Sequence, residues 1–132
     1  MDKEFDGFRM QQPVIDQDPR PEPRLQLTEA AIANENRQFR GTGGRSPENR
    51  GSGFHPAFLD AQTHAIYDSR FPDGRPAPFH MLDGLPEEVV VARHASGRVA
   101  GVKPTVVSGF VREGRFYTRE EAAGCIAAET KH

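Results

Sequence analysis

The run Thr105-Val-Val-Ser-Gly-Phe-Val-Arg-Glu-Gly-Arg-Phe-Tyr117, followed by Thr118-Arg-Glu-Glu121, decides the fold. Two apolar stretches flank Glu113-Gly114, and this arrangement predicts a β-hairpin with strands over 105–112 and 115–117. The Thr and the last Glu of the following tetrapeptide form a capping box, in which each side chain bonds to a backbone N–H near the start of a helix. A helix over about 118–129 is therefore expected directly after the hairpin.

Further short strands are expected before this hairpin. Strands at 57–59 and 65–67 flank a turn in which Asp60 accepts backbone hydrogen bonds. Strands at 88–94 and 98–102 are joined by Ala95-Ser96-Gly97. The pattern predicts an α+β fold, a small antiparallel β-meander of about five or six short strands closed by a C-terminal helix.

The bulky side chains of these elements indicate the core. We expect six of them to be buried together: Val90, Val107, Phe110, Val111, Phe116 and Ile126. The run from Thr105 to Val111 has neither proline nor charge, so at a sheet edge it would pair with another chain, either a second copy in a homodimer or an extended partner peptide. Its apolar character favours a central strand instead.

The two parts of the chain differ in apolar content. Residues 1–53 hold 13 of the residues A, V, I, L, M, F, W, Y and C, whereas residues 54–132 hold 34. Only the second part buries enough apolar surface to offset the entropy of ordering. We therefore expect a largely disordered tail and linker over 1–53 and a globular domain over 54–132.

The tail carries a weak helical pattern. Thr28 can cap a helix, and Leu25, Ile32 and Phe39 recur every seven residues. One apolar residue per heptad gives too narrow an apolar stripe to pack the helix stably against the globular domain. We expect this segment to order on a protein partner, with these three side chains in contact.

Basic residues support a second hypothesis. The glycine-rich linker lacks the Gly-Lys-Ser/Thr ending of a phosphate loop, but arginines spaced by glycine can contact RNA or DNA phosphates. Arginines beside aromatic side chains on a sheet are also typical of RNA-binding folds. The candidate nucleic-acid contacts are Arg37, Arg40, Arg45, Arg50, Arg93, Arg98, Arg112, Arg115 and Phe110.

A third hypothesis is a small metal-dependent enzyme. The candidate ligands are His55, Asp60, His64, His80 and Asp83. Their spacing matches no helical pair of ligands, and Asp60 already has a role in a turn. The single cysteine, Cys125, lies among alanines rather than at a helix N-terminus, which favours packing over nucleophilic chemistry. We therefore assign no catalytic, cofactor-binding or metal-binding residue and expect no cofactor.

Composition sets the remaining expectations. The net charge of −2 is too small to indicate electrostatic attraction to nucleic acid or to a membrane surface. The acidic N-terminus does not fit a signal peptide, and a lone cysteine fits a reducing compartment. We expect a soluble cytoplasmic protein, a non-enzymatic binding or adaptor module whose tail orders on a protein partner.

Overall fold

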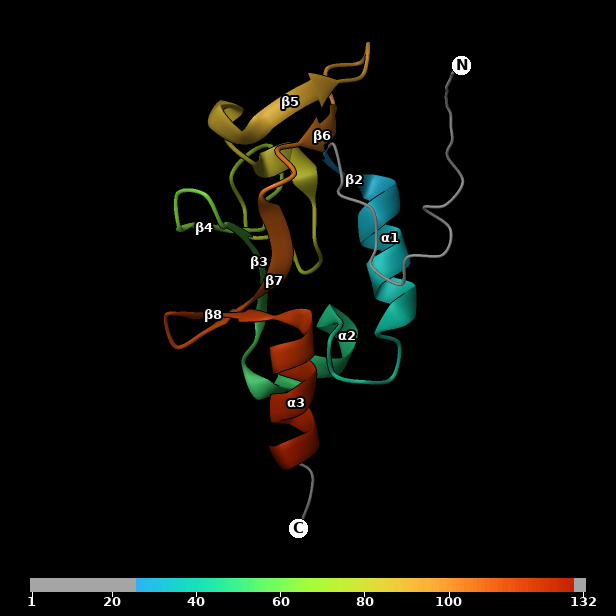
Figure 1. Cartoon of the computed structure of the whole chain (residues 1–132), viewed down its shortest axis with the longest axis vertical. Coiled ribbons are helices and arrows are strands. Elements are labelled where there is room, and N and C mark those ends of the chain that lie inside the picture. Colours follow the sequence, from blue (N-terminus) through green and yellow to red (C-terminus); the bar gives the residue numbers. More distant parts are fainter. Residues whose placement is uncertain (1–25, 130–132) are drawn as a thin grey trace, which may run out of the picture.

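The computed structural model describes residues 26–129 and confirms the α+β class (Figure 1). Its antiparallel strands form two sheets, of order β2-β6-β5 and β4-β3-β7-β8. The strands are β2 (Leu27–Thr28), β3 (His55–Asp60), β4 (Ala65–Asp68), β5 (Val90–Arg93), β6 (Val99–Val102), β7 (Val106–Arg112) and β8 (Arg115–Thr118). The helices are α1 (Glu29–Gln38), α2 (Ser46–Asn49) and α3 (Arg119–Glu129), with 3₁₀ turns η2 (Arg50–Ser52), η3 (Leu82–Gly84) and η4 (Glu87–Val89).

The three hairpins expected from the sequence are confirmed. β3 pairs with β4, β5 with β6, and β7 with β8. The last turn places Glu113 at φ 55° and Gly114 at φ 80°. Two successive left-handed residues are what a tight hairpin turn requires, because their twist matches that of the strands.

The capping box at the start of α3 is also confirmed. The Thr118 N–H donates to Glu121 Oε1 at 2.9 Å, and the Glu121 N–H donates to Thr118 Oγ1 at 3.0 Å. Two otherwise unpaired backbone donors are thereby satisfied. The helix consequently begins where the sequence predicts.

Asp60 ties the first hairpin to the segment between β6 and β7. Its carboxylate accepts from the Gln62 N–H at 3.0 Å, as the turn interpretation requires, and also contacts Lys103 Nζ at 2.9 Å and Thr105 Oγ1 at 2.8 Å. The hydrogen bond from Lys103 contributes most to lowering the pKa of Asp60 to about 2, and the other partners add to it, although burial opposes the shift.

Two apolar clusters form the core. The first lies between the two sheets and α1, and the second lies between the four-stranded sheet and α3. The first comprises Leu27, Ile32, Phe58, Leu82, Leu85, Val89, Val99, Val102 and Val106. The second comprises Phe54, Phe110 and Ala122, with Tyr117, Cys125 and Ile126 packed against it.

The predicted core is only partly right. Phe110 is fully buried, and Val90 and Ile126 are partly buried against the two clusters. Val107, Val111 and Phe116 are half-buried on the other face of the four-stranded sheet. The reason is strand alternation: neighbours in β7 point to opposite faces, and Phe110 takes the inner one.

Residues 26–53, on the tail side of the predicted boundary, form part of the packed structure. Thr28 caps α1 as expected, with Oγ1 accepting from the Ala31 N–H at 3.2 Å. Leu27 is 0% exposed and Ile32 6% exposed in the first core cluster. The boundary at residue 53 therefore does not coincide with an edge of the core. Residues 1–25 lie outside the described range.

Candidate protein-binding face

One face of the four-stranded sheet carries an apolar surface in contact with solvent. Strand register places Ile66 beside Leu59 and Leu59 beside Val107. Val111, four residues further along β7, pairs with Phe116. All five side chains share one face because they occupy matching positions of the pleat. Ile66 is 44% exposed and the other four are half-buried. We call these five residues the open face.

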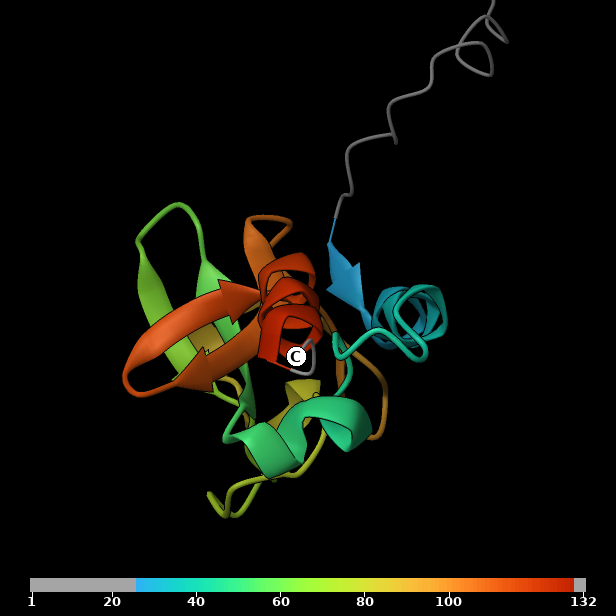
Figure 2. The same ribbon diagram turned by 90° about the horizontal axis from the view of Figure 1, so that it is seen from below.

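The helices occupy the opposite face. Ser108 and Phe110 of β7 point away from the open face, and Ser108 Oγ contacts Glu35 of α1. Phe110 packs against Ala122 of α3. Figure 2 shows α1 and α3 on the same side of the two hairpins that form this sheet.

A glycine allows the Phe116 ring to lie across the open face. A Cβ at Gly109 would overlap both the Phe116 ring and the backbone of Tyr117. The sheet at this point therefore requires glycine, and the aromatic ring covers its backbone.

A pocket of about 310 Å³ adjoins one end of the open face. His55 and Val111 are cross-strand partners on that face, and the hairpin bridge between Arg70 and Pro76 forms the opposite wall. The lining residues are His55, Pro56, Asp68, Ser69, Arg70, Pro76, Ala77 and Val111. We call it the Ala77 pocket.

A buried polar network joins α1, β7 and α3. Arg119 is 4% exposed, and its guanidinium donates to Ser108 Oγ at 3.1 Å, to the Gly44 carbonyl at 2.9 Å and to His80 Nδ1 at 3.1 Å. Its Nε also lies 3.3 Å from Glu35 Oε1, and Ser108 Oγ donates to the same oxygen at 2.5 Å. Burial lowers the pKa of Arg119, and the Glu35 carboxylate opposes that shift.

This network combines Ser, His and Glu, but its geometry is structural. His80 Nε2 lies 2.7 Å from the Gly109 carbonyl and must donate to it, so Nδ1 is the acceptor for Arg119. Burial and the Arg119 charge lower the pKa of His80 to about 3, so the ring is neutral at neutral pH. Both ring nitrogens are engaged away from Ser108, and the arrangement does not build a nucleophile–base pair.

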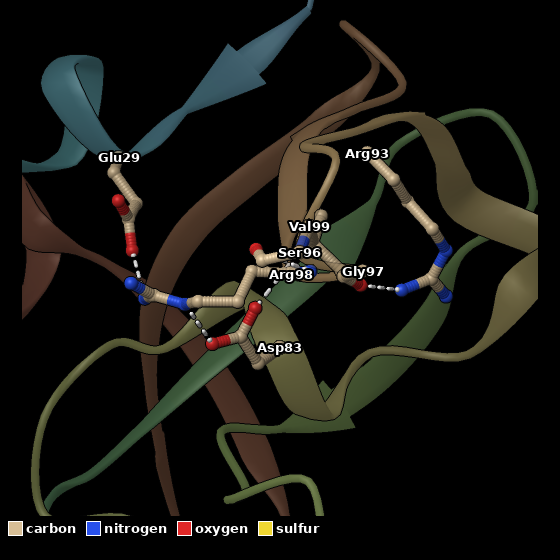
Figure 3. A network of polar contacts seen from close by, with 7 residues as sticks. All are labelled: Glu29, Asp83, Arg93, Ser96, Gly97, Arg98 and Val99. Atoms are coloured by element: carbon tan, nitrogen blue, oxygen red, sulfur yellow. Dashed lines mark hydrogen bonds and ion pairs between the residues drawn. The ribbon is translucent and has the colours of Figure 1, made fainter.

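Two candidate arginines at the small sheet, Arg93 and Arg98, make polar contacts. Figure 3 shows those of Arg98 with Glu29 and Asp83 and that of Arg93 with Gly97. Arg98 bridges Glu29 of α1 at 2.7 Å and Asp83 of η3 at 3.1 Å. The other oxygen of Asp83 accepts from the Val99 N–H at 2.9 Å. Arg93 donates to both oxygens of Glu87 and to the Gly97 carbonyl.

The candidate arginines of the last hairpin contact aromatic rings. Arg112 lies 4.2 Å from the Phe54 ring centre and pairs with Glu129 at 2.9 Å. Arg115 lies 4.8 Å from the ring centre of Tyr117. Phe110, the candidate stacking residue, is 0% exposed and packs against Arg119 on the inner face. It is therefore not positioned to stack on a base.

The four linker-side arginines are separated from these. Arg45 pairs with Glu48 at 3.2 Å, and Arg50 donates to the Pro78 carbonyl at 3.1 Å. Arg37 donates to an α1 asparagine, and Arg40 is exposed just after the helix. The candidate basic residues thus lie at several places, many of them in ion pairs.

The candidate partner-binding residues of the tail have different fates. Ile32 lies in the core, and Phe39 is half-buried with its ring against Gly44. Leu25 lies outside the described residues. As placed, Ile32 stabilises the fold rather than presenting a contact to a partner.

The candidate metal ligands do not converge. Within residues 26–129, the structure shows no group of three or more His, Cys, Asp or Glu side chains suited to a metal ion. His55 and His64 are exposed, and His80 belongs to the Arg119 network. Asp60 and Asp83 are bound to basic side chains. Cys125 is a half-buried free thiol packed against the second core cluster.

Sequence patterns alone did not reveal the Arg119 network or the open face. Arg119 follows the capping threonine, a position that is usually exposed on a helix surface. Ser108 lies within an apolar run, and nothing in the sequence around it indicates a polar partner. The two faces of that run are equally apolar, which leaves the direction of burial open.

The comparisons with known proteins give no further assignment. No family model, curated protein or solved structure matches the chain. Among residues 26–129, the structure has no helix with the length and apolar character needed to cross a bilayer.

Proposed function

We propose that this protein is a non-enzymatic binding or adaptor module that docks a separate protein through the open face. The supporting observation is the solvent contact of Leu59, Ile66, Val107, Val111 and Phe116 on a sheet whose helices lie on the other side. Contiguous apolar surface of this kind is typical of protein interaction sites.

The area of the open face fits a transient partner. Four strands and three rows of side chains span roughly 400 Å² of sheet surface. Stable complexes bury about 800 Å² on each partner, and permanent dimers bury more. We therefore propose a partner with an apolar, uncharged surface that covers this face and its polar rim. The interface would bury less area than that of a permanent assembly.

The N-terminal segment completes the proposal. Residues 1–25 lie outside the described range, and we propose that they order on the same partner. Leu25 and Phe39 remain candidate contacts at this end, whereas Ile32 is held in the core. The compartment we propose is the reducing cytoplasm, consistent with the single cysteine of the chain.

Site-specific photocrosslinking tests the proposal. A photoreactive phenylalanine analogue at position 66 is expected to crosslink one discrete protein in cells. The same analogue at Val91, which is 52% exposed on the other sheet, is the matched control and should not crosslink that protein. Binding of the purified protein should then fall at least tenfold with Ile66→Lys and stay unchanged with Val91→Lys.

Three outcomes would contradict the proposal. Equal crosslinking from positions 66 and 91 would show that the partner does not bind preferentially at the open face. Crosslinks only to nucleic acid, lost after nuclease treatment, would favour the nucleic-acid hypothesis. Crosslinks only to a second copy of the chain would replace a separate partner by self-association.

A further inference from the structure

The Ala77 pocket has the size and lining of a site for one aromatic ring. Its volume of about 310 Å³ lies at the small end of the range of roughly 300–1,000 Å³ for ligand pockets. Its apolar walls come from Pro56, Pro76, Ala77 and Val111. A pocket of this size accepts a single large side chain more readily than a cofactor.

A carboxylate at the edge of the pocket adds a polar requirement. The Asp68 side chain is 53% exposed, and its ion pair with Arg70 has an N···O distance of 3.5 Å. That distance is too long for a strong hydrogen bond, so Asp68 retains capacity to accept one. An apolar slot with an acceptor at its edge is complementary to a ring that carries a donor.

We infer that the partner inserts a tryptophan or tyrosine side chain into the Ala77 pocket, where its N–H or O–H donates to Asp68. This inference rests on the proposed function and names the anchor of the same interface. Aromatic anchors in well-packed pockets dominate the energetics of many protein interfaces.

Strand register places the anchor next to the open face. Asp68 is the partner of Ala57, and the pair Leu59–Ile66 follows two residues further along β3. Side-chain rows two residues apart are separated by about 7 Å. One partner segment can therefore fill the pocket and lie on the open face together.

A titration with single aromatic amides tests the inference. N-acetyltryptophanamide added to the isotope-labelled full chain is expected to shift the amide NMR signals of His55, Ser69, Ala77 and Val111. Shifts that are absent at the solubility limit of the probe, or that concentrate elsewhere, would overturn the inference.

Two variants separate the hydrogen bond from the apolar slot. Asp68→Ala should weaken N-acetyltryptophanamide binding by roughly threefold to tenfold, the effect of one hydrogen bond. It should leave N-acetylphenylalaninamide unaffected, because that probe has no ring donor. Asp73→Ala is the matched control, since Asp73 and Arg75 form an exposed ion pair with the same two-residue spacing. Ala77→Leu should fill the slot and weaken both probes.

Partner binding distinguishes failure of the inference from failure of the proposed function. If Ile66→Lys abolishes binding of the crosslinked protein while Asp68→Ala and Ala77→Leu leave it unchanged, only the aromatic anchor is wrong. If none of the three variants affects binding, the open face is not the docking site.

Discussion

Replacing Phe110 by alanine should destabilise the protein far more than replacing Phe116. The Phe110 ring is 0% exposed, with the Phe54 ring centre at 6.2 Å and the His80 ring centre at 5.1 Å. Its loss creates a cavity and removes these contacts, which typically costs about 3–5 kcal/mol. Phe116 is half-buried over Gly109, so its replacement should cost about 1–2 kcal/mol.

The measurement is urea unfolding followed by far-ultraviolet circular dichroism. The total stability of such a domain is about 5–15 kcal/mol, so Phe110→Ala consumes a large part of it. Equal slopes with urea concentration in the two variants would show that each change acts on stability rather than on the unfolded ensemble.

Neighbouring valines repeat the comparison within a single strand. Val106 is 0% exposed, whereas Val107 is half-buried on the open face. Val106→Ala should therefore lower the free energy of unfolding more than Val107→Ala. Losses that are equal within each pair, or larger for Phe116 and Val107, would refute the assignment of the two sheet faces.

Three further predictions follow from the polar network and the N-terminal elements. Because the pKa of His80 is lowered to about 3 from 6.5, its ring NMR signals should not titrate between pH 8 and pH 5. The free energy of unfolding should decrease as the pH falls below about 6.5, because the histidine of the unfolded chain takes up a proton there. His80 ring signals that titrate between pH 8 and pH 5 would contradict the lowered pKa. Arg119→Ala should cost about 3–5 kcal/mol, because it removes the buried guanidinium that donates to His80 Nδ1 and to the Gly44 carbonyl. Arg93→Ala on the surface should cost less than about 1 kcal/mol in the same urea assay. Deleting residues 1–50 removes Ile32 and the rest of α1 from the core, so we expect calorimetry to show a melting temperature lower by about 10 °C or more; an unchanged value would support the boundary at residue 53.

Local sequence signals predicted the hairpins and the last helix well. The turn at Glu113-Gly114 and the capping box at Thr118 depend on residues within a few positions of one another. Such signals are readable because their physical cause is local. The same holds for Thr28, whose cap on α1 is formed as the sequence suggests.

The assignment of faces and the docking of α1 depend on distant residues. Val106 and Val107 are chemically identical, and only packing against the other elements of the first core cluster decides which one is buried. α1 has a narrow apolar stripe, but Glu29 and Glu35 connect it to Arg98 and Arg119, more than 60 residues away. No periodicity reveals such ion pairs, so the sequence predicted a helix that orders only on a partner.

The central strand pair has a consequence for the order of folding. β3 ends at Asp60 and its partner β7 begins at Val106, so the middle of the four-stranded sheet requires closure of a long loop. A ribosome that has released only β3 and β4 exposes a two-stranded hairpin, which is marginally stable in water. The sheet gains its third strand only when β7 emerges, and loop closure over this span slows refolding relative to a helical chain of equal length. During synthesis, the apolar side chains of β3 therefore stay uncovered until β7, some 45 residues later in the chain, has been translated. Nascent chains are most prone to associate during this interval, because their apolar side chains are exposed.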